Sequence, residues 1–155
     1  MPQTKQSKHE HYMQRCLEVA RSAVKAGNLG VGSVIVKDET IVAEAGETLP
    51  AQPDPAGHAE LIAIRRACQI LNTLDLSDCI LYTTAEPCWM CSYAIRATGI
   101  QQVVCGAATP DVGGISTAYP LLTDATISGW GPPPHVTTGV LAAECAAVRQ
   151  LPPKQ

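Results

Sequence analysis

The sequence contains no phenylalanine, and aromatic residues make up only 4% of its 155 positions. Since 46% of the residues are hydrophobic, the core must be built from aliphatic side chains rather than from aromatic rings. No apolar run approaches the roughly 20 residues that span a bilayer, so we expect no membrane-spanning helix. The length fits one domain over residues 1–155.

An excess of basic residues is also absent. The chain has 11 Lys and Arg against 14 Asp and Glu, which gives a net charge of −3 at pH 7. Proteins that bind a nucleic-acid backbone usually carry excess positive charge. We therefore expect a small-molecule partner rather than a nucleic acid.

The N-terminal segment lacks the apolar core of a signal peptide, and we expect residues 1–8 to form a frayed tail. The seven cysteines are an odd number, unlike the paired framework of a small secreted domain. We therefore expect a cytoplasmic protein whose cysteines are thiols, some of them metal ligands.

The hydrophobic periodicity predicts a helix, a hairpin, and then strands alternating with helices. The predicted elements are a helix over 10–26, strands over 31–36 and 41–45, a helix over 59–71, a strand over 79–83, a helix that begins at Pro87 and continues over 90–98, strands over 103–107 and 136–141, and a weak helix over 141–151. Residues 108–135 are rich in Gly, Pro and Thr and are predicted to form a long loop. This order favours an α/β fold, a three-layer α/β/α sandwich whose mixed five-stranded sheet has helices on both faces.

Three candidate metal ligands lie at the starts of two predicted helices. His58 precedes the first, and Cys88 and Cys91 begin the second, 30 residues further on. In a helix–strand–helix unit, both helix N-termini can lie at the same end of the sheet. The i, i+3 spacing of the cysteines places both sulfurs on one helix face, and imidazole nitrogen with thiolate sulfur suits Zn²⁺. We predict one zinc ion per chain, with water as fourth ligand, the arrangement typical of a catalytic site.

Glu60 is the candidate proton carrier. It lies two residues after His58, so its carboxylate can face a substrate instead of the metal. A glutamate beside a zinc-bound water can take a proton from that water and pass it on.

The sequence His-Ala-Glu at 58–60, followed by Pro-Cys-Trp-Met-Cys at 87–91, matches the signature of zinc-dependent nucleic-base deaminases. The chain thereby resembles the cytidine deaminase-like superfamily, and is most similar to the bacterial guanine deaminases, with cytosine and tRNA adenosine deaminases close behind. The resemblance implies hydrolytic release of ammonia from an aminated heterocycle. It also implies that the backbone at Ala59 and Ala85 orients the ring.

Position 47, eleven residues before His58, is Glu where these relatives usually carry Asn. A carboxylate only accepts hydrogen bonds, so Glu47 suits a substrate edge with N–H donors, as in guanine or an aminotriazine. Glu47 could equally be a charged residue at a strand end. Trp89 is a candidate for stacking on the ring, and Asp111 for the acid that guanine deaminases carry after the fourth strand. Guanine is our first candidate substrate and cytosine the second.

Two other functions stay open. One is tRNA adenosine deamination, although the last helix offers only Arg149 as a basic residue. The other is a non-catalytic zinc scaffold, which needs a fourth protein ligand such as Cys68, Cys79 or Cys105. Related enzymes form dimers through a broad face, so we expect a homodimer with the apolar helix at 90–97 in the contact.

Overall fold

The computed structural model describes residues 2–154, and its nine helices and strands form one layered arrangement. The elements are α1 (Lys5–Lys25), β1 (Gly32–Lys37), β2 (Thr40–Gly46), α2 (Ala59–Leu71), β3 (Cys79–Ala85), α3 (Trp89–Thr98), β4 (Gln102–Ala107), β5 (His135–Thr137) and α4 (Ala142–Gln150). The strands form one sheet in the order β2-β1-β3-β4-β5. β1 is antiparallel to β2 and β3, whereas β3, β4 and β5 run parallel, so the predicted mixed five-stranded sheet is confirmed.

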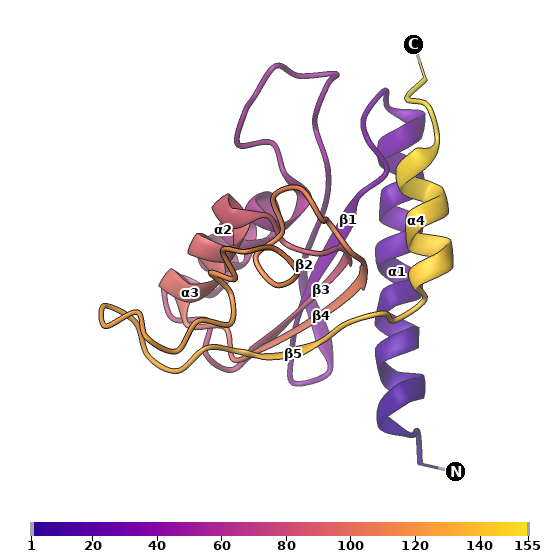
Figure 1. Cartoon of the computed structure of the whole chain (residues 1–155). Coiled ribbons are helices and arrows are strands. Elements are labelled where there is room, and N and C mark those ends of the chain that lie inside the picture. The colour runs from indigo at the N-terminus through magenta and orange to yellow at the C-terminus, as the bar shows by residue number, and fades with distance from the viewer. Residues whose placement is uncertain (1, 155) are drawn as a thin grey trace.

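Helices cover both faces of this sheet. Figure 1 shows α1 and α4 side by side on one face and α2 and α3 on the other. An aliphatic cluster lies on each face of the sheet. The cluster on the side of α2 and α3 includes Leu81 and Ile95, and the cluster between α1 and the sheet includes Met13 and Leu17. Each such fully buried side chain contributes about 1.5–3 kcal/mol to stability. The predicted three-layer sandwich is therefore confirmed, with a core that contains no Phe.

The predicted tail over 1–8 is wrong from Lys5 onward, because α1 begins there. The Thr4 hydroxyl accepts a hydrogen bond from the backbone N–H of Ser7 at 3.1 Å, which caps the helix N-terminus. The first turn is exposed and polar, so it has no apolar periodicity from which a helix could be predicted. Met1 lies outside the described residues.

The predicted strand over 136–141 is also wrong in its extent, since β5 ends at Thr137. Gly139 and Leu141 both adopt positive φ, which turns the chain away from the sheet and into α4. Val140 is buried in the cluster beneath α1, so its apolar character reflects packing rather than strand pairing.

Residues 108–134 connect β4 to β5 without a helix or strand, as predicted. Arg96 on α3 fixes this connection by donating hydrogen bonds to the carbonyls of Leu121 and Asp124, each at 2.9 Å. Its guanidinium also lies over the ring of Trp130, 5.1 Å from the centroid. The buried guanidinium of Arg96 thereby fixes the conformation of this connection, which has no helix or strand of its own.

Between residues 2 and 154, we find no helix that is long and apolar enough to cross a membrane.

Candidate active site

The three predicted metal ligands lie together where α2 and α3 begin. His58 is the N-cap of α2, Cys88 is the N-cap of α3, and Cys91 lies in the first turn of α3. Nδ1 of His58 is 3.4 Å from Sγ of Cys88 and 3.6 Å from Sγ of Cys91. A tetrahedral zinc ion, with Zn–S about 2.3 Å and Zn–N about 2.0 Å, separates nitrogen and sulfur by about 3.5 Å. The three side chains therefore fit Zn²⁺ without rearrangement.

The protonation of this cluster is coupled. A hydrogen bond from Cys91 and the neighbouring imidazole of His58 lower the pKa of Cys88 to about 4. The hydrogen bond with Cys88 in turn raises the pKa of His58 to about 9, and the pKa of Cys91 is raised by its hydrogen bond to Cys88 and by burial. Zinc binds thiolates and neutral imidazole, so metal binding at these three side chains is coupled to the release of protons.

Among the described residues, the cluster has no fourth protein ligand. The group of mutually close metal-binding atoms within residues 2–154 consists of His58, Cys88 and Cys91, whose ligand atoms lie within 4.8 Å of one another. The alternative fourth ligands considered above, Cys68, Cys79 and Cys105, are not part of this group. A site with three protein ligands has room for water or substrate, which is the arrangement of a catalytic zinc.

Glu60 is buried beside the cluster, with only 4% of its surface exposed, and it lines the same pocket as His58 and Cys88. The Thr83 hydroxyl donates a hydrogen bond to Oε1 of Glu60 at 2.8 Å, and the Ser33 hydroxyl donates to Thr83 at 2.9 Å. These bonds fix the direction of the carboxylate. Burial raises the pKa of Glu60, which suits a group that must both take and give a proton.

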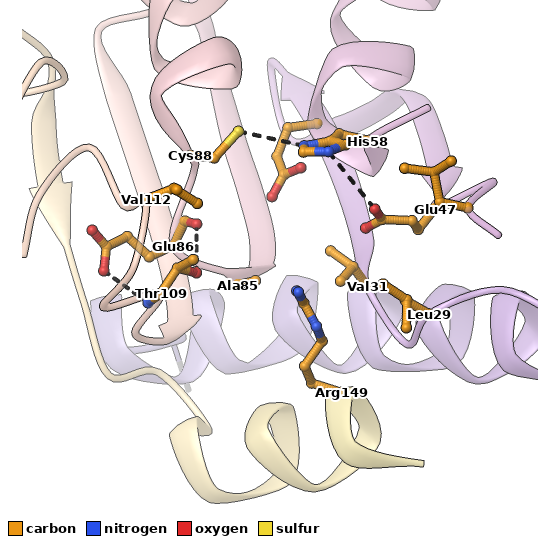
Figure 2. A pocket seen from close by; sticks show the side chains of 12 residues that line it. Leu29, Val31, Glu47, His58, Ala85, Glu86, Cys88, Thr109, Val112 and Arg149 are labelled. Carbon is orange, nitrogen blue, oxygen red and sulfur yellow. Dashed lines mark hydrogen bonds and ion pairs between the residues drawn. The ribbon is translucent and has the colours of Figure 1, made fainter. Parts of the chain in front are cut away.

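The pocket in front of the cluster has a volume of about 180 Å³. Its walls combine the candidate catalytic groups with aliphatic side chains and one residue of α4, as Figure 2 shows. The lining residues are Leu29, Val31, Glu47, Leu49, His58, Glu60, Ala85, Glu86, Cys88, Thr109, Val112 and Arg149. A small pocket that combines aliphatic side chains with several polar groups can hold and orient a small polar ring.

Glu47 lines this pocket and is 7% exposed. Its Oε1 lies 4.0 Å from Nε2 of His58, which is too long for a hydrogen bond. Burial and the nearby carboxylate of Glu60 raise the pKa of Glu47 to about 7. Within residues 2–154 the Glu47 side chain makes no hydrogen bond, and its polar contact is this long approach to His58, so its oxygens can still accept from a ligand.

The other predicted substrate contacts lie in different places. Ala85 lines the pocket, whereas Ala59 is fully buried as the first residue of α2, a position whose backbone N–H has no partner within the helix. The indole N–H of Trp89 donates to the carbonyl of Tyr119 at 3.1 Å, and Trp89 does not line the pocket. Asp111 lines a neighbouring pocket instead. The structure thus brings Glu47 and Ala85 to the zinc cluster but leaves Trp89 and Asp111 away from it.

Two charged residues of the pocket wall were not predicted as site residues from the sequence. One is Arg149, which reaches the pocket from α4. The other is Glu86, whose carboxylate accepts hydrogen bonds from the backbone N–H groups of Thr109, Ile115 and Ser116 at 2.8–3.0 Å. Glu86 thereby holds the loop that supplies Thr109 and Val112 to the pocket wall. In the sequence, Glu86 directly precedes the Pro-Cys-Trp-Met-Cys motif that carries the family resemblance, but the motif gave it no predicted role.

The loop held by Glu86 also needs a glycine. A Cβ atom at Gly113 would collide with the Glu86 carboxylate, and Gly113 forms a β-bridge with Cys88. The backbone N–H of Trp89 donates to the carbonyl of Val112 at 3.0 Å, which ties the loop to the start of α3. The loop and the cysteine pair are therefore one structural unit.

Comparison with known proteins agrees with this geometry. The family model of the cytidine and deoxycytidylate deaminase zinc-binding region matches residues 6–107. This match includes His58, Glu60, Cys88 and Cys91 and ends before the connection between β4 and β5.

Two characterised proteins illustrate the range of relatives. The chain is 37% identical to the tRNA-specific adenosine deaminase of Aquifex aeolicus (strain VF5) over 119 residues, which are 77% of this chain and 79% of that protein. It is 48% identical to the guanine deaminase of Bacillus subtilis (strain 168) over 88 residues, 56% of each chain. A solved structure from a study of A-to-I editing by tRNA:A34 deaminases has a TM-score of 0.81 at 31% identity, covering 89% of this chain and 98% of that one.

Proposed function

The chain belongs to the family of deaminases that share the cytidine and deoxycytidylate deaminase zinc-binding region, and on this basis we propose that it deaminates a free nucleobase or a similar aminated heterocycle. It is a zinc-dependent deaminase of that family, and His58, Cys88 and Cys91 are the residues that fit the metal. Guanine is the first candidate substrate and cytosine the second.

The observation that carries this choice of substrate is the carboxylate of Glu47 in the pocket wall. The positive charge of a bound zinc ion favours the ionised form of Glu47, which only accepts hydrogen bonds. Free guanine and cytosine each offer a ring N–H to such an acceptor. Adenosine within RNA offers none apart from the amino group that must leave, and its ring nitrogens would face the carboxylate with lone pairs. Glu47 therefore favours a free lactam-type base over an RNA adenosine.

In the proposed reaction, the metal activates water and the side chains of the protein transfer protons. Zinc, when bound, supplies a water molecule whose pKa is lowered toward neutrality. Glu60, held by Thr83, takes one proton and delivers it to the ring nitrogen next to the carbon that bears the amino group. As the new carbonyl forms, Glu60 takes the second proton of the added water from its oxygen and passes it to the departing nitrogen. The balance is one water consumed, one C–N bond broken, one carbonyl formed and one ammonia released.

The ring itself is held by the walls of the pocket. Leu29, Val31 and Val112 present aliphatic surface, and Ala85 lies at the end of β3, where a backbone carbonyl can accept from the substrate. We propose that the N–H at Ala59 orients the ring as well, since this first residue of α2 has no partner for its N–H within the helix. Trp89 and Asp111 remain predicted contacts whose side chains would have to move to reach a ring in this pocket.

The test is ammonia release by the zinc-loaded protein from guanine, cytosine, adenine, isocytosine, ammeline, the corresponding nucleosides and total tRNA. Glu60→Gln serves as the blank because it preserves the shape of the pocket and removes the proton carrier. Release from guanine or cytosine, absent in Glu60→Gln, supports the proposal. Release from tRNA alone would contradict it.

The comparisons favour a second candidate, tRNA adenosine deamination. The relative from Aquifex aeolicus and the structure with a TM-score of 0.81 both act on tRNA by name, and both cover at least 77% of this chain. The net charge of −3 argues against this candidate. A gel-shift titration with tRNA at two salt concentrations separates the two, because backbone binding weakens steeply with salt.

We also propose a homodimer in the cytoplasm. Met90 and Tyr93 on the outer surface of α3 are 37% and 59% exposed, which leaves apolar side chains for a partner to cover. The seven cysteines form no disulfide within residues 2–154, which fits a reducing compartment. Sedimentation of the protein and of Tyr93→Asp tests the dimer; identical masses for both would contradict this contact.

A further inference from the structure

Arg149 approaches the zinc pocket from the opposite layer of the molecule. It lies on α4, which packs beside α1, and Figure 2 shows its guanidinium pointing into the pocket toward the space in front of His58 and Glu47. Apart from His58, it is the one basic side chain among the described residues that line this pocket. The position is therefore part of the substrate wall, although α4 lies outside the segment matched by the family model.

The guanidinium of Arg149 has no partner in the part of the chain that the structure describes. Across residues 2–154 it makes no ion pair and no hydrogen bond, in contrast to Arg15 and Arg96, which are both engaged. Arginine carries five N–H donors and no acceptor, and it stays charged at all physiological pH values. Arg149 is exposed, so solvent satisfies these donors in the free protein, and they can turn to an acceptor atom on a ligand in the pocket that the side chain lines.

The side chains of Glu47 and Arg149 have complementary hydrogen-bonding groups. The carboxylate accepts only and the guanidinium donates only, and both line the same pocket of about 180 Å³. They form no ion pair with each other, so a ligand can bind between them.

We propose that Arg149 and Glu47 together recognise a lactam edge of the substrate, that is, a ring N–H beside a ring carbonyl. Arg149 donates to the carbonyl oxygen, and Glu47 accepts from the N–H. This inference rests on the proposed function, because it names the substrate class of the same site. Guanine and cytosine carry such an edge, whereas adenine and 2-aminopurine do not.

A phosphate is the competing ligand for Arg149. It would have to lie in the adjoining pocket of about 220 Å³, which shares Arg149, Ala85 and Thr109 with the zinc pocket. Asp111 lines that second pocket, and its carboxylate would repel a phosphate. The ring carbonyl is therefore the acceptor that the surrounding charges favour.

The experiment measures equilibrium binding to zinc-loaded Glu60→Gln, which binds without turning over. Guanine and the fluorescent 2-aminopurine form a matched pair, since both carry the 2-amino group and only guanine has the lactam edge. When the Arg149→Ala substitution is added to Glu60→Gln, the Kd of guanine should rise about tenfold, as expected for the loss of one charged hydrogen bond. The Kd of 2-aminopurine should stay unchanged. Arg149→Lys should lose part of the guanine affinity, because it keeps the charge without the planar fork.

Arg21→Ala is the matched control, because it removes an exposed arginine on α1 that does not line the pocket. It should change neither Kd. Equal weakening of guanine and 2-aminopurine by Arg149→Ala, or no weakening of either, would overturn the inference. So would a loss confined to nucleoside 5′-monophosphates, which would assign Arg149 to a phosphate.

Failure of this inference can be separated from failure of the proposed function. If the wild-type protein releases ammonia from guanine or cytosine while Arg149→Ala keeps the same kcat/KM on both, only the role of Arg149 is wrong. If the wild type acts on no free base and Glu60→Gln binds none, both proposals fail together.

Discussion

The pocket at the starts of α2 and α3 and the core beneath α1 both bury polar side chains, but they satisfy them differently. In the pocket, the carboxylate of Glu47 has no hydrogen-bond partner within the described chain, and its oxygens face a cavity. Beneath α1, His9 is 5% exposed, with Nδ1 3.0 Å from the Tyr82 hydroxyl and Nε2 buried without a partner among residues 2–154. An unpaired polar atom beside a cavity is available to a ligand, whereas one beside packed side chains only lowers stability.

Glu60→Gln should give the largest loss of turnover among these variants, with little change in stability. The amide keeps the shape of the side chain but cannot carry the proton, so turnover should fall by about 10²–10⁴-fold. Bound zinc and the melting temperature should stay near the wild-type values, since His58, Cys88 and Cys91 are untouched. Metal analysis and ammonia assays on the same preparation check this. A variant with wild-type turnover would remove Glu60 from the mechanism.

Glu86→Ala should affect both stability and activity. It leaves the backbone N–H groups of Thr109, Ile115 and Ser116 without their acceptor, which costs about 1–3 kcal/mol of unfolding free energy. Because Thr109 lines the pocket, KM should rise as the loop loosens. Ser116→Ala is the milder control, since it removes only the 2.7 Å bond from the Ser116 hydroxyl to Glu86.

Urea titration and substrate titration of both variants test this role. A KM that rises in Glu86→Ala but not in Ser116→Ala identifies Glu86 as a positioning residue for the pocket wall. Unchanged KM in Glu86→Ala, with stability lost, would make it a purely structural acid.

His9 provides a pH-dependent test of the core beneath α1. Burial lowers the pKa of His9, and the charges of Lys5, Lys8 and His135 act in the same direction, with Tyr82 as the facing hydrogen-bond partner. The unfolded chain therefore binds a proton near its ordinary pKa of about 6.5, before the folded chain does. Unfolding free energy should fall as pH drops below that value, by at most about 1.4 kcal/mol per pH unit for one proton.

His9→Gln should flatten this pH dependence. His11→Gln is the matched control because His11 is exposed on the same helix. Urea unfolding of the three proteins at pH 7.5, 6.5 and 5.5 makes the comparison. Equal slopes in the wild type and in His9→Gln would show that the acid sensitivity comes from elsewhere.

The site residues that could be predicted from the sequence lie in local patterns, whereas the others depend on how distant elements pack. The ligands and Glu60 lie in short local patterns at helix starts, and alternating periodicities predicted the sandwich. Arg149 could not be placed, because its role depends on α4 packing across the end of the sheet, about which its weakly amphipathic sequence says nothing. Trp89 lies between the two cysteines in sequence, but helix geometry directs its side chain toward Tyr119 rather than into the pocket.

The extent of two elements was mispredicted for a related reason. The start of α1 is set by the cap at Thr4 rather than by apolar spacing, and the end of β5 is set by the turn at Gly139. Apolar residues such as Val140 pack equally well on a strand or at a helix start, so periodicity alone does not distinguish them.

The smallest effect is expected outside both regions, at the ion pair between Arg15 on α1 and Glu44 on β2. The two groups meet through two hydrogen bonds at 2.6 and 2.8 Å, but Arg15 is 43% and Glu44 37% exposed. Solvent and salt screen such a pair, so Arg15→Gln should change the unfolding free energy by less than about 1 kcal/mol. The difference from wild type should shrink further in 1 M NaCl, where the screening length is about 3 Å.

Urea unfolding at low and high salt tests this last prediction, with Arg21→Gln as the matched control on the same helix. A cost above that of Glu86→Ala would contradict the distinction drawn between exposed and buried charges. It would mean that the contact between α1 and β2, rather than the pocket loop, is the polar interaction on which this fold depends most.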